Sequence, residues 1–90
     1  MSGIVKRFEK ECIDLINSME GKTKSVQLAM AKDKAIELIN ANQKQLAVIW
    51  FRSVCIQFGL AQNDSARKFL GIAGSNPGVF NERFLDVFKL

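Results

Sequence analysis

Hydrophobic residues recur every three or four positions along the first twenty residues, and mostly charged or polar residues occupy the positions between them. This spacing places the apolar side chains on one face of a helix. Gly21 follows at a position where glycine often ends a helix. The pattern therefore predicts a helix over about residues 3–20. Its apolar face would consist of Ile4, Phe8, Cys12, Leu15, Ile16 and Met19.

A second helical pattern begins near Thr23 or Ser25, after a short polar turn. Its alanine-rich composition favours a helix. The polar segment 40–45 either ends this helix or bends it, because several of its residues are weak helix formers. We expect one apolar face made of Val26, Met30, Ala31, Ala35, Leu38 and Ile39.

The segment 46–60 is the most apolar part of the chain. Its β-branched and aromatic residues would also suit a buried strand, but no second strand-like segment exists to pair with it. We therefore predict a helix that is apolar nearly all round, either central in a bundle or in contact with another subunit. One face would hold Ala47, Trp50, Phe51, Val54, Cys55 and Phe58, with Ile49 and Ile56 opposite. If another subunit covers this helix, Ile49, Trp50 and Ile56 are the expected interface residues.

The C-terminal third predicts two further helices. Gly59 would end the apolar segment, and Asn63 or Asp64 can cap the helix that follows. The loop 74–78 ends that helix, and Pro77 suits the first position of a last one. The apolar face of the last helix would hold Val79, Phe80, Phe84, Leu85 and Phe88. Together these elements predict an all-α fold, a single domain over residues 1–90 that forms a small bundle of four or five helices with short loops.

Composition narrows the classes of function. The 90 residues contain no histidine and only two cysteines, which form no C-x-x-C pair. We predict no catalytic residue, no metal site and no cofactor, and we expect both cysteines to be buried reduced thiols. The N-terminus lacks the apolar core of a signal peptide. The most apolar segment, 46–60, is shorter than the about 20 apolar residues that a membrane span needs. The expected location is therefore the cytoplasm.

Two short patterns resemble chemical sites without supporting one. Asp33 and Glu37 share a helix face and could in principle bind a cation, but we favour the simpler interpretation, an exposed solvated face. Gly71, Gly74 and Gly78 have a spacing like that of a phosphate loop. They lack the preceding strand and the Gly-Lys-Ser/Thr ending that such a loop requires. Neither pattern indicates an enzyme.

The net charge of +4 is compatible with an anionic partner. Residues 64–88 have the outline of a helix-turn-helix, although Glu82 and Asp86 would repel phosphates. A charge inside the apolar segment, at Arg52, must reach water, pair with an acid or bind an anion such as a phosphate-bearing ligand. The candidate contacts to nucleic acid or to an anion are Arg52, Arg67, Lys68, Asn81 and Arg83.

The surplus of apolar surface on the segment 46–60 favours protein binding, because exposed apolar patches on small soluble proteins mark interfaces. We expect a non-enzymatic adaptor or inhibitor that binds another protein and forms a homo-oligomer. One alternative is a nucleic-acid-binding regulator that uses the pair of helices in 64–88. The other is a binder of a small anionic ligand, with Arg52 as a contact.

Overall fold

The computed structural model describes residues 2–89 of the chain, with the side chains of residues 6–89, so the side chain of Ile4 lies outside the described part. Four helices follow one another: α1 (Ser2–Met19), α2 (Lys24–Asn40), α3 (Lys44–Phe58) and α4 (Asp64–Ser75). A 3-10 turn, η1 (Pro77–Val79), and a one-turn helix, α5 (Glu82–Leu85), complete the fold. No strand occurs between residues 2 and 89, which confirms the predicted all-α bundle.

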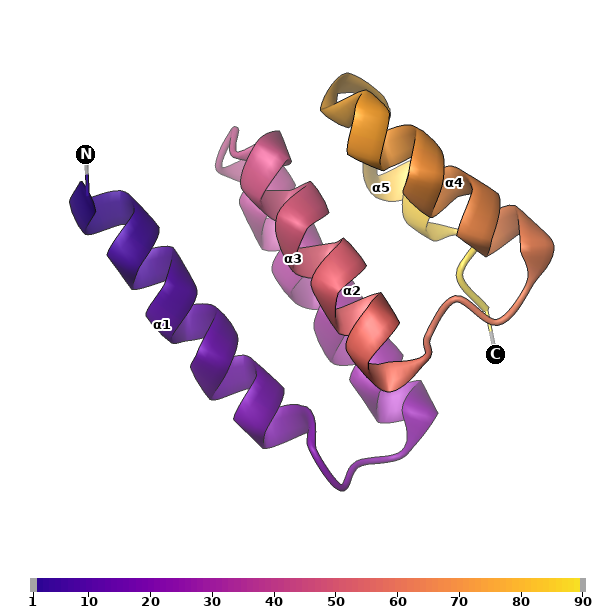
Figure 1. The fold of residues 1–90 in the computed structure, drawn as a ribbon, viewed down its shortest axis with the longest axis horizontal. Helices are drawn as coiled ribbons and strands as arrows, with labels where there is room; N and C mark the ends of the chain where they lie inside the picture. Colours follow the sequence, from indigo (N-terminus) through magenta and orange to yellow (C-terminus); the bar gives the residue numbers. More distant parts are fainter. Residues whose placement is uncertain (1, 90) are drawn as a thin grey trace.

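The helices form two layers in a flat molecule of 36 × 31 × 18 Å. Figure 1 shows α1, α3 and α4 side by side in the front layer, with α2 behind α3 and α5 behind α4. α3 therefore has a neighbour on both sides and another behind it. Its remaining side forms the middle of one broad surface of the molecule.

The prediction left open whether α2 and α3 form one helix, and the structure separates them. Asn42 adopts a left-handed conformation with φ of 61°, which asparagine tolerates better than most residues. The backbone N–H of Gln43 then donates to the carbonyl of Leu38 at 2.8 Å, and that of Asn42 donates to Ile39. These two bonds form a Schellman motif, which satisfies the last carbonyl groups of α2 and turns the chain into α3.

The other helix ends agree with the expected capping residues. The hydroxyl of Thr23 accepts a hydrogen bond from a backbone N–H in the first turn of α2. Gly59 ends α3 with a φ of 64°, a left-handed conformation that favours glycine. Asn63, and not Asp64, caps α4, because its side chain accepts from the backbone N–H of Ala66 at 2.8 Å.

α3 supplies the centre of the hydrophobic core. Trp50, Phe51 and Val54 are fully buried along its inner side. The ring of Phe51 packs edge-on against that of Phe88 at 4.8 Å and also contacts Phe80. The expected inner face of this helix is confirmed, with only Phe58 less than fully buried. The interpretation of α3 as the central helix therefore holds for every side but the outer one.

Two details of the predicted helices are wrong. In α2, Val26 is exposed, and Gln27 and Lys34 are buried among the apolar residues. Both polar side chains have partners. Gln27 donates to the carbonyl of Met19 at 3.0 Å, and Lys34 donates to carboxylates. Hydrogen bonds to α1 and its C-terminal end thus replace apolar contacts at these positions, because a buried polar group needs a partner.

The predicted last helix is also wrong in length. Pro77 begins only a 3-10 turn, and a new cap at Asn81 opens the single turn of α5. The interrupted backbone brings Phe80, Phe84 and Phe88 together against α3, as the short distances between their rings show. Burial of these rings favours the interrupted backbone over one continuous helix.

Candidate functional site

The outer face of α3 carries exposed hydrophobic side chains although the rest of the helix is core. Ile49 is 54% exposed and Ile56 is 74% exposed, which makes Ile56 the most exposed large hydrophobic residue described. They are seven residues apart and therefore lie on one stripe of the helix. We define the outer face of α3 by its exposed residues Gln45, Ile49, Arg52, Ser53 and Ile56.

Trp50, expected beside the two isoleucines, belongs to the core instead. Its side chain is 1% exposed, and its indole N–H donates to the carbonyl of Ala31 in α2 at 3.0 Å. Successive residues of a helix point about 100° apart, so Trp50 turns inward where Ile49 turns outward. The tryptophan supports the outer face from below and is not a surface residue.

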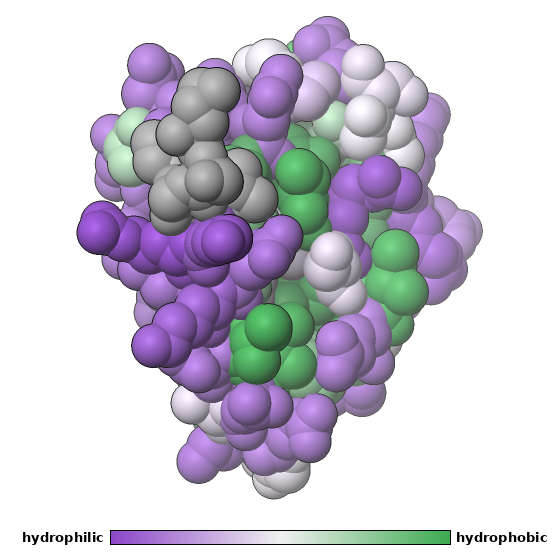
Figure 2. Space-filling view, turned by 60° about the vertical axis from the view of Figure 1, so that its left-hand side comes forward, coloured by the Kyte–Doolittle hydropathy of each residue, from purple (hydrophilic) through white to green (hydrophobic). Residues whose placement is uncertain are grey.

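An apolar groove of about 260 Å³ runs between α1 and α3, on one side of the outer face. We call it the α1–α3 groove. Its rim on α1 carries Ile13, which is 58% exposed, and Glu9. Figure 2, turned to bring the α1 side forward, shows exposed hydrophobic residues between hydrophilic ones. The groove is lined mainly by Phe8, Cys12, Ile13, Ile16, Ile49 and Trp50.

Ile13 lies outside the apolar face predicted for the first helix. That face consists of one stripe of side chains, and Ile13 lies beside the stripe. The available signal was its position next to Cys12 and three residues before Ile16, which widens the apolar stripe toward α3.

A second groove, of about 380 Å³, lies on the other side of the outer face between α3 and α4. We call it the α3–α4 groove. Arg52 and Arg67 both line it. The guanidinium of Arg52 lies against Gly74, where an added Cβ would be 2.9 Å from Nη1. Arg52 forms no ion pair with any residue in the described part, whereas Arg67 donates to Asp64 at 2.7 Å. Arg52 was expected to reach water, to pair with an acid or to bind an anion, and in the structure its side chain is exposed to water.

The helix-turn-helix geometry expected for residues 64–88 is not present. The second helix, α5, spans only Glu82–Leu85, too short to present several side chains to a DNA groove. Asn81 is engaged in capping, since it accepts from the backbone N–H of Phe84 and donates to the carbonyl of Val79. Lys68 and Arg83 are exposed on different helices. This correction follows from the interruption of the last helix described above.

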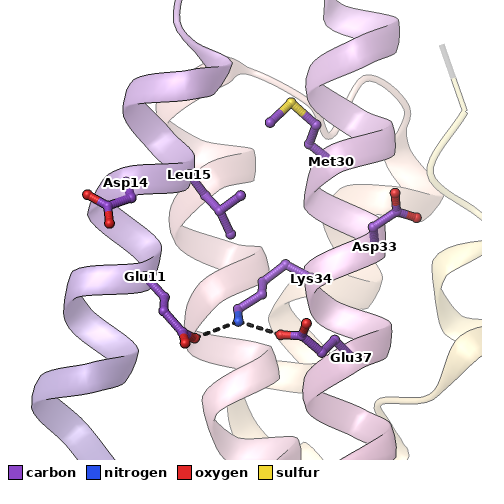
Figure 3. Close-up of a pocket in the computed structure, with 7 residues that line it drawn as sticks. All are labelled: Glu11, Asp14, Leu15, Met30, Asp33, Lys34 and Glu37. Atoms are coloured by element: carbon purple, nitrogen blue, oxygen red, sulfur yellow. Dashed lines mark hydrogen bonds and ion pairs between the residues drawn. The ribbon is translucent and has the colours of Figure 1, made fainter.

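A third cavity, of about 500 Å³ between α1 and α2, contains four carboxylates: Glu11, Asp14, Asp33 and Glu37 (Figure 3). The ammonium group of Lys34 lies between two of them and donates to Glu11 at 2.8 Å and to Glu37. Within residues 2–89 no group of three or more acidic or cysteine side chains is placed to hold a metal ion.

Lys34 and Glu11 stay charged at neutral pH. The hydrogen bond from Lys34 lowers the pKa of the Glu11 carboxyl, and the charge of Lys34 adds to this effect. Burial alone would lower the pKa of Lys34, but its bonds to Glu11 and Glu37 outweigh burial and leave that pKa raised. The cluster therefore joins α1 to α2 through an ion pair. Glu37, for which the sequence favoured a solvated surface over a cation site, is part of this ion pair.

Both cysteines are free thiols, and Cys55 is buried whereas Cys12 is only partly buried. Burial raises the pKa of Cys12 to about 11 and that of Cys55 to about 12. Both groups are protonated at neutral pH, and a protonated thiol is a poor nucleophile. The thiol of Cys12 acts as part of the apolar wall of the α1–α3 groove.

No helix in residues 2–89 is both long enough and apolar enough to cross a membrane. Comparison of the chain with protein families, with curated proteins and with solved structures found no match.

Proposed function

We propose that this protein is a non-enzymatic helical module, an adaptor or inhibitor, that acts by binding protein through the outer face of α3 and the grooves beside it. One observation carries the proposal: Ile49 and Ile56 are exposed on the helix that otherwise forms the core. A face of this kind, apolar in the middle and polar at its edges, is typical of protein interfaces.

The two isoleucines are suited to be the anchors of such an interface. Full burial of an isoleucine side chain stabilises by roughly 1.5–3 kcal/mol, and both still expose more than half of theirs. They lie between two grooves that can receive side chains from a partner. A few central anchors of this kind supply most of the binding energy in many interfaces.

We also propose a cytoplasmic location, which the two free thiols support because cysteines stay reduced in a reducing compartment.

Photo-crosslinking in the cell tests the proposal. Benzoylphenylalanine replaces Ile56, and a matched variant carries it at Ile72 on α4, which is 40% exposed and lines neither groove. The proposal predicts a discrete protein adduct from position 56, to a second copy or to another protein, and none of that mass from position 72. Equal, diffuse labelling from both positions would contradict it.

A further inference from the structure

We infer that the occupant of the outer face of α3 is a second copy of this chain, docked about a twofold axis that runs along α3. In this arrangement Ile49 of each copy lies in the α1–α3 groove of the other, and Ile56 follows it on the same stripe of α3. The inference rests on the proposed function, because it names the partner of the same face. It goes further in fixing both the identity of the partner and its orientation.

The size of the surface fits a dimer. The broad side of the molecule measures 36 × 31 Å, which leaves room for a contact of the usual size. A stable protein interface covers about 800 Å² on each partner. The two grooves hold only about 260 and 380 Å³, and Ile49 lines the first whereas Ile56 lines the second, so a small ligand in either groove would leave the other isoleucine uncovered. A second broad face covers the stripe and both grooves together.

The stripe and the α1–α3 groove are neighbours, and twofold symmetry can exchange them. Ile49 belongs to the stripe and also to the wall of the groove. α1 and α3 run in the same direction (Figure 1), and the groove between them extends along α3 from Ile49 to Ser53. An axis parallel to α3 and midway between Ile49 and the groove places Ile49 of each copy in the opposite groove. One symmetry operation thus forms two equal contacts, as in other isologous dimers.

Charge selects this orientation over the reverse one. With the axis along α3, the α1 edge of one copy lies over the α3–α4 groove of the other. That edge carries Glu9, and the α3–α4 groove carries Arg52, which has no ion-pair partner in the described part. With the axis across α3, each α3–α4 groove would face its own copy and bring Arg52 near Arg52. Opposite charges favour the first arrangement and like charges disfavour the second.

Charge reversal in the purified full chain tests the pairing. Sedimentation equilibrium gives the dimer dissociation constant for the wild type, Glu9→Arg, Arg52→Glu and the combined variant, with Arg83→Glu as a control outside the face. We expect each single change on the face to weaken the dimer about tenfold or more. The combined variant should return to within about threefold of the wild type at low salt. Circular dichroism melting checks that each variant is folded.

Cysteine crosslinking tests the orientation independently. In a Cys12→Ala background, Ile49→Cys and Ile56→Cys are each oxidised alone and then as a mixture. Parallel α3 helices predict a disulfide-linked dimer from each variant alone, because each position meets its own copy. A dimer that forms only in the mixture would show antiparallel helices and overturn the stated axis.

Other results separate this inference from the proposed function. A wild-type chain that stays monomeric up to about 1 mM overturns the second copy as partner. If position 56 then crosslinks to a different protein in the cell, the binding function stands and only the inference fails. If the combined variant dimerises more weakly than either single charge reversal, the pairing of Glu9 with Arg52 is overturned.

Discussion

Replacement of Trp50 by phenylalanine tests whether the tryptophan belongs to the core and not to the binding face. The indole is fully buried and donates to the carbonyl of Ala31 at 3.0 Å, so it joins α3 to α2. A phenylalanine keeps most of the ring packing but has no N–H. The carbonyl of Ala31 keeps its partner within α2, so no buried group is orphaned.

The size of the effect follows from three contributions. Loss of the hydrogen bond costs about 1 kcal/mol. The smaller ring leaves a cavity of about 40 Å³, which costs a further ~1 kcal/mol at about 24 cal/mol per Å³. About 40 Å² less apolar surface is buried, which adds ~1 kcal/mol at about 25 cal/mol per Å². Because the last two contributions overlap, we expect Trp50→Phe to lower the free energy of unfolding by about 2–3 kcal/mol.

Urea unfolding followed by circular dichroism measures this change, since the variant has no tryptophan for fluorescence. The melting temperature should fall by about 10–20 °C, as expected for a domain of this size. Ile56→Val serves as the control and should change stability by less than about 0.5 kcal/mol, because its side chain is exposed. A loss below about 0.5 kcal/mol in Trp50→Phe would refute the placement of this residue in the core.

Two further predictions concern the backbone and the ion pair. Gly59→Ala should lower the free energy of unfolding by about 1–2 kcal/mol, because φ is 64° at this position. Gly71→Ala in α4 should raise it by roughly 0.5–1 kcal/mol, because an added Cβ would meet open space there. Thermal melts in which both variants shift in the same direction would contradict the helix ends described. Glu11→Gln should lower stability at pH 7 by less than about 1 kcal/mol, since Glu11 is half exposed. The folded-state pKa of Glu11 is lowered, so its stabilisation is complete above the ordinary value of 4.5 and disappears as the pH falls through the lower folded value. Urea melts of wild type and variant should therefore converge as the pH falls below 4.5, and a gap that stays the same from pH 7 into acid would rule out the ion pair with Lys34.

The sequence predicted those parts of the fold that depend on local chemistry. Asn63 and Gly59 mark helix ends through their own side chain or backbone, and the helical period correctly separates the inner residues of α3 from Ile49 and Ile56. The amino-acid composition and the helical period of the hydrophobic residues were enough to predict the all-α class and the exposed stripe of Ile49 and Ile56.

The parts that failed depend on contacts between distant residues. Lys34 is buried because it meets a carboxylate on another helix, 23 residues away in sequence. The last helix is interrupted because Phe80 and Phe88 pack against Phe51, a contact that no local pattern reveals. Trp50 was grouped with the surface isoleucines by residue type, although its helical angle already placed it on the inner side.

The central claim is that a second copy of the chain covers the outer face of α3, and sedimentation equilibrium of one variant pair tests it most directly. Ile49→Ser/Ile56→Ser removes the stripe, and Ile72→Ser/Val79→Ser removes two exposed residues that line neither groove. We predict a dimer for the wild type and the control pair, and a folded monomer for the stripe variant at the same concentration. Equal masses for all three proteins would contradict the account.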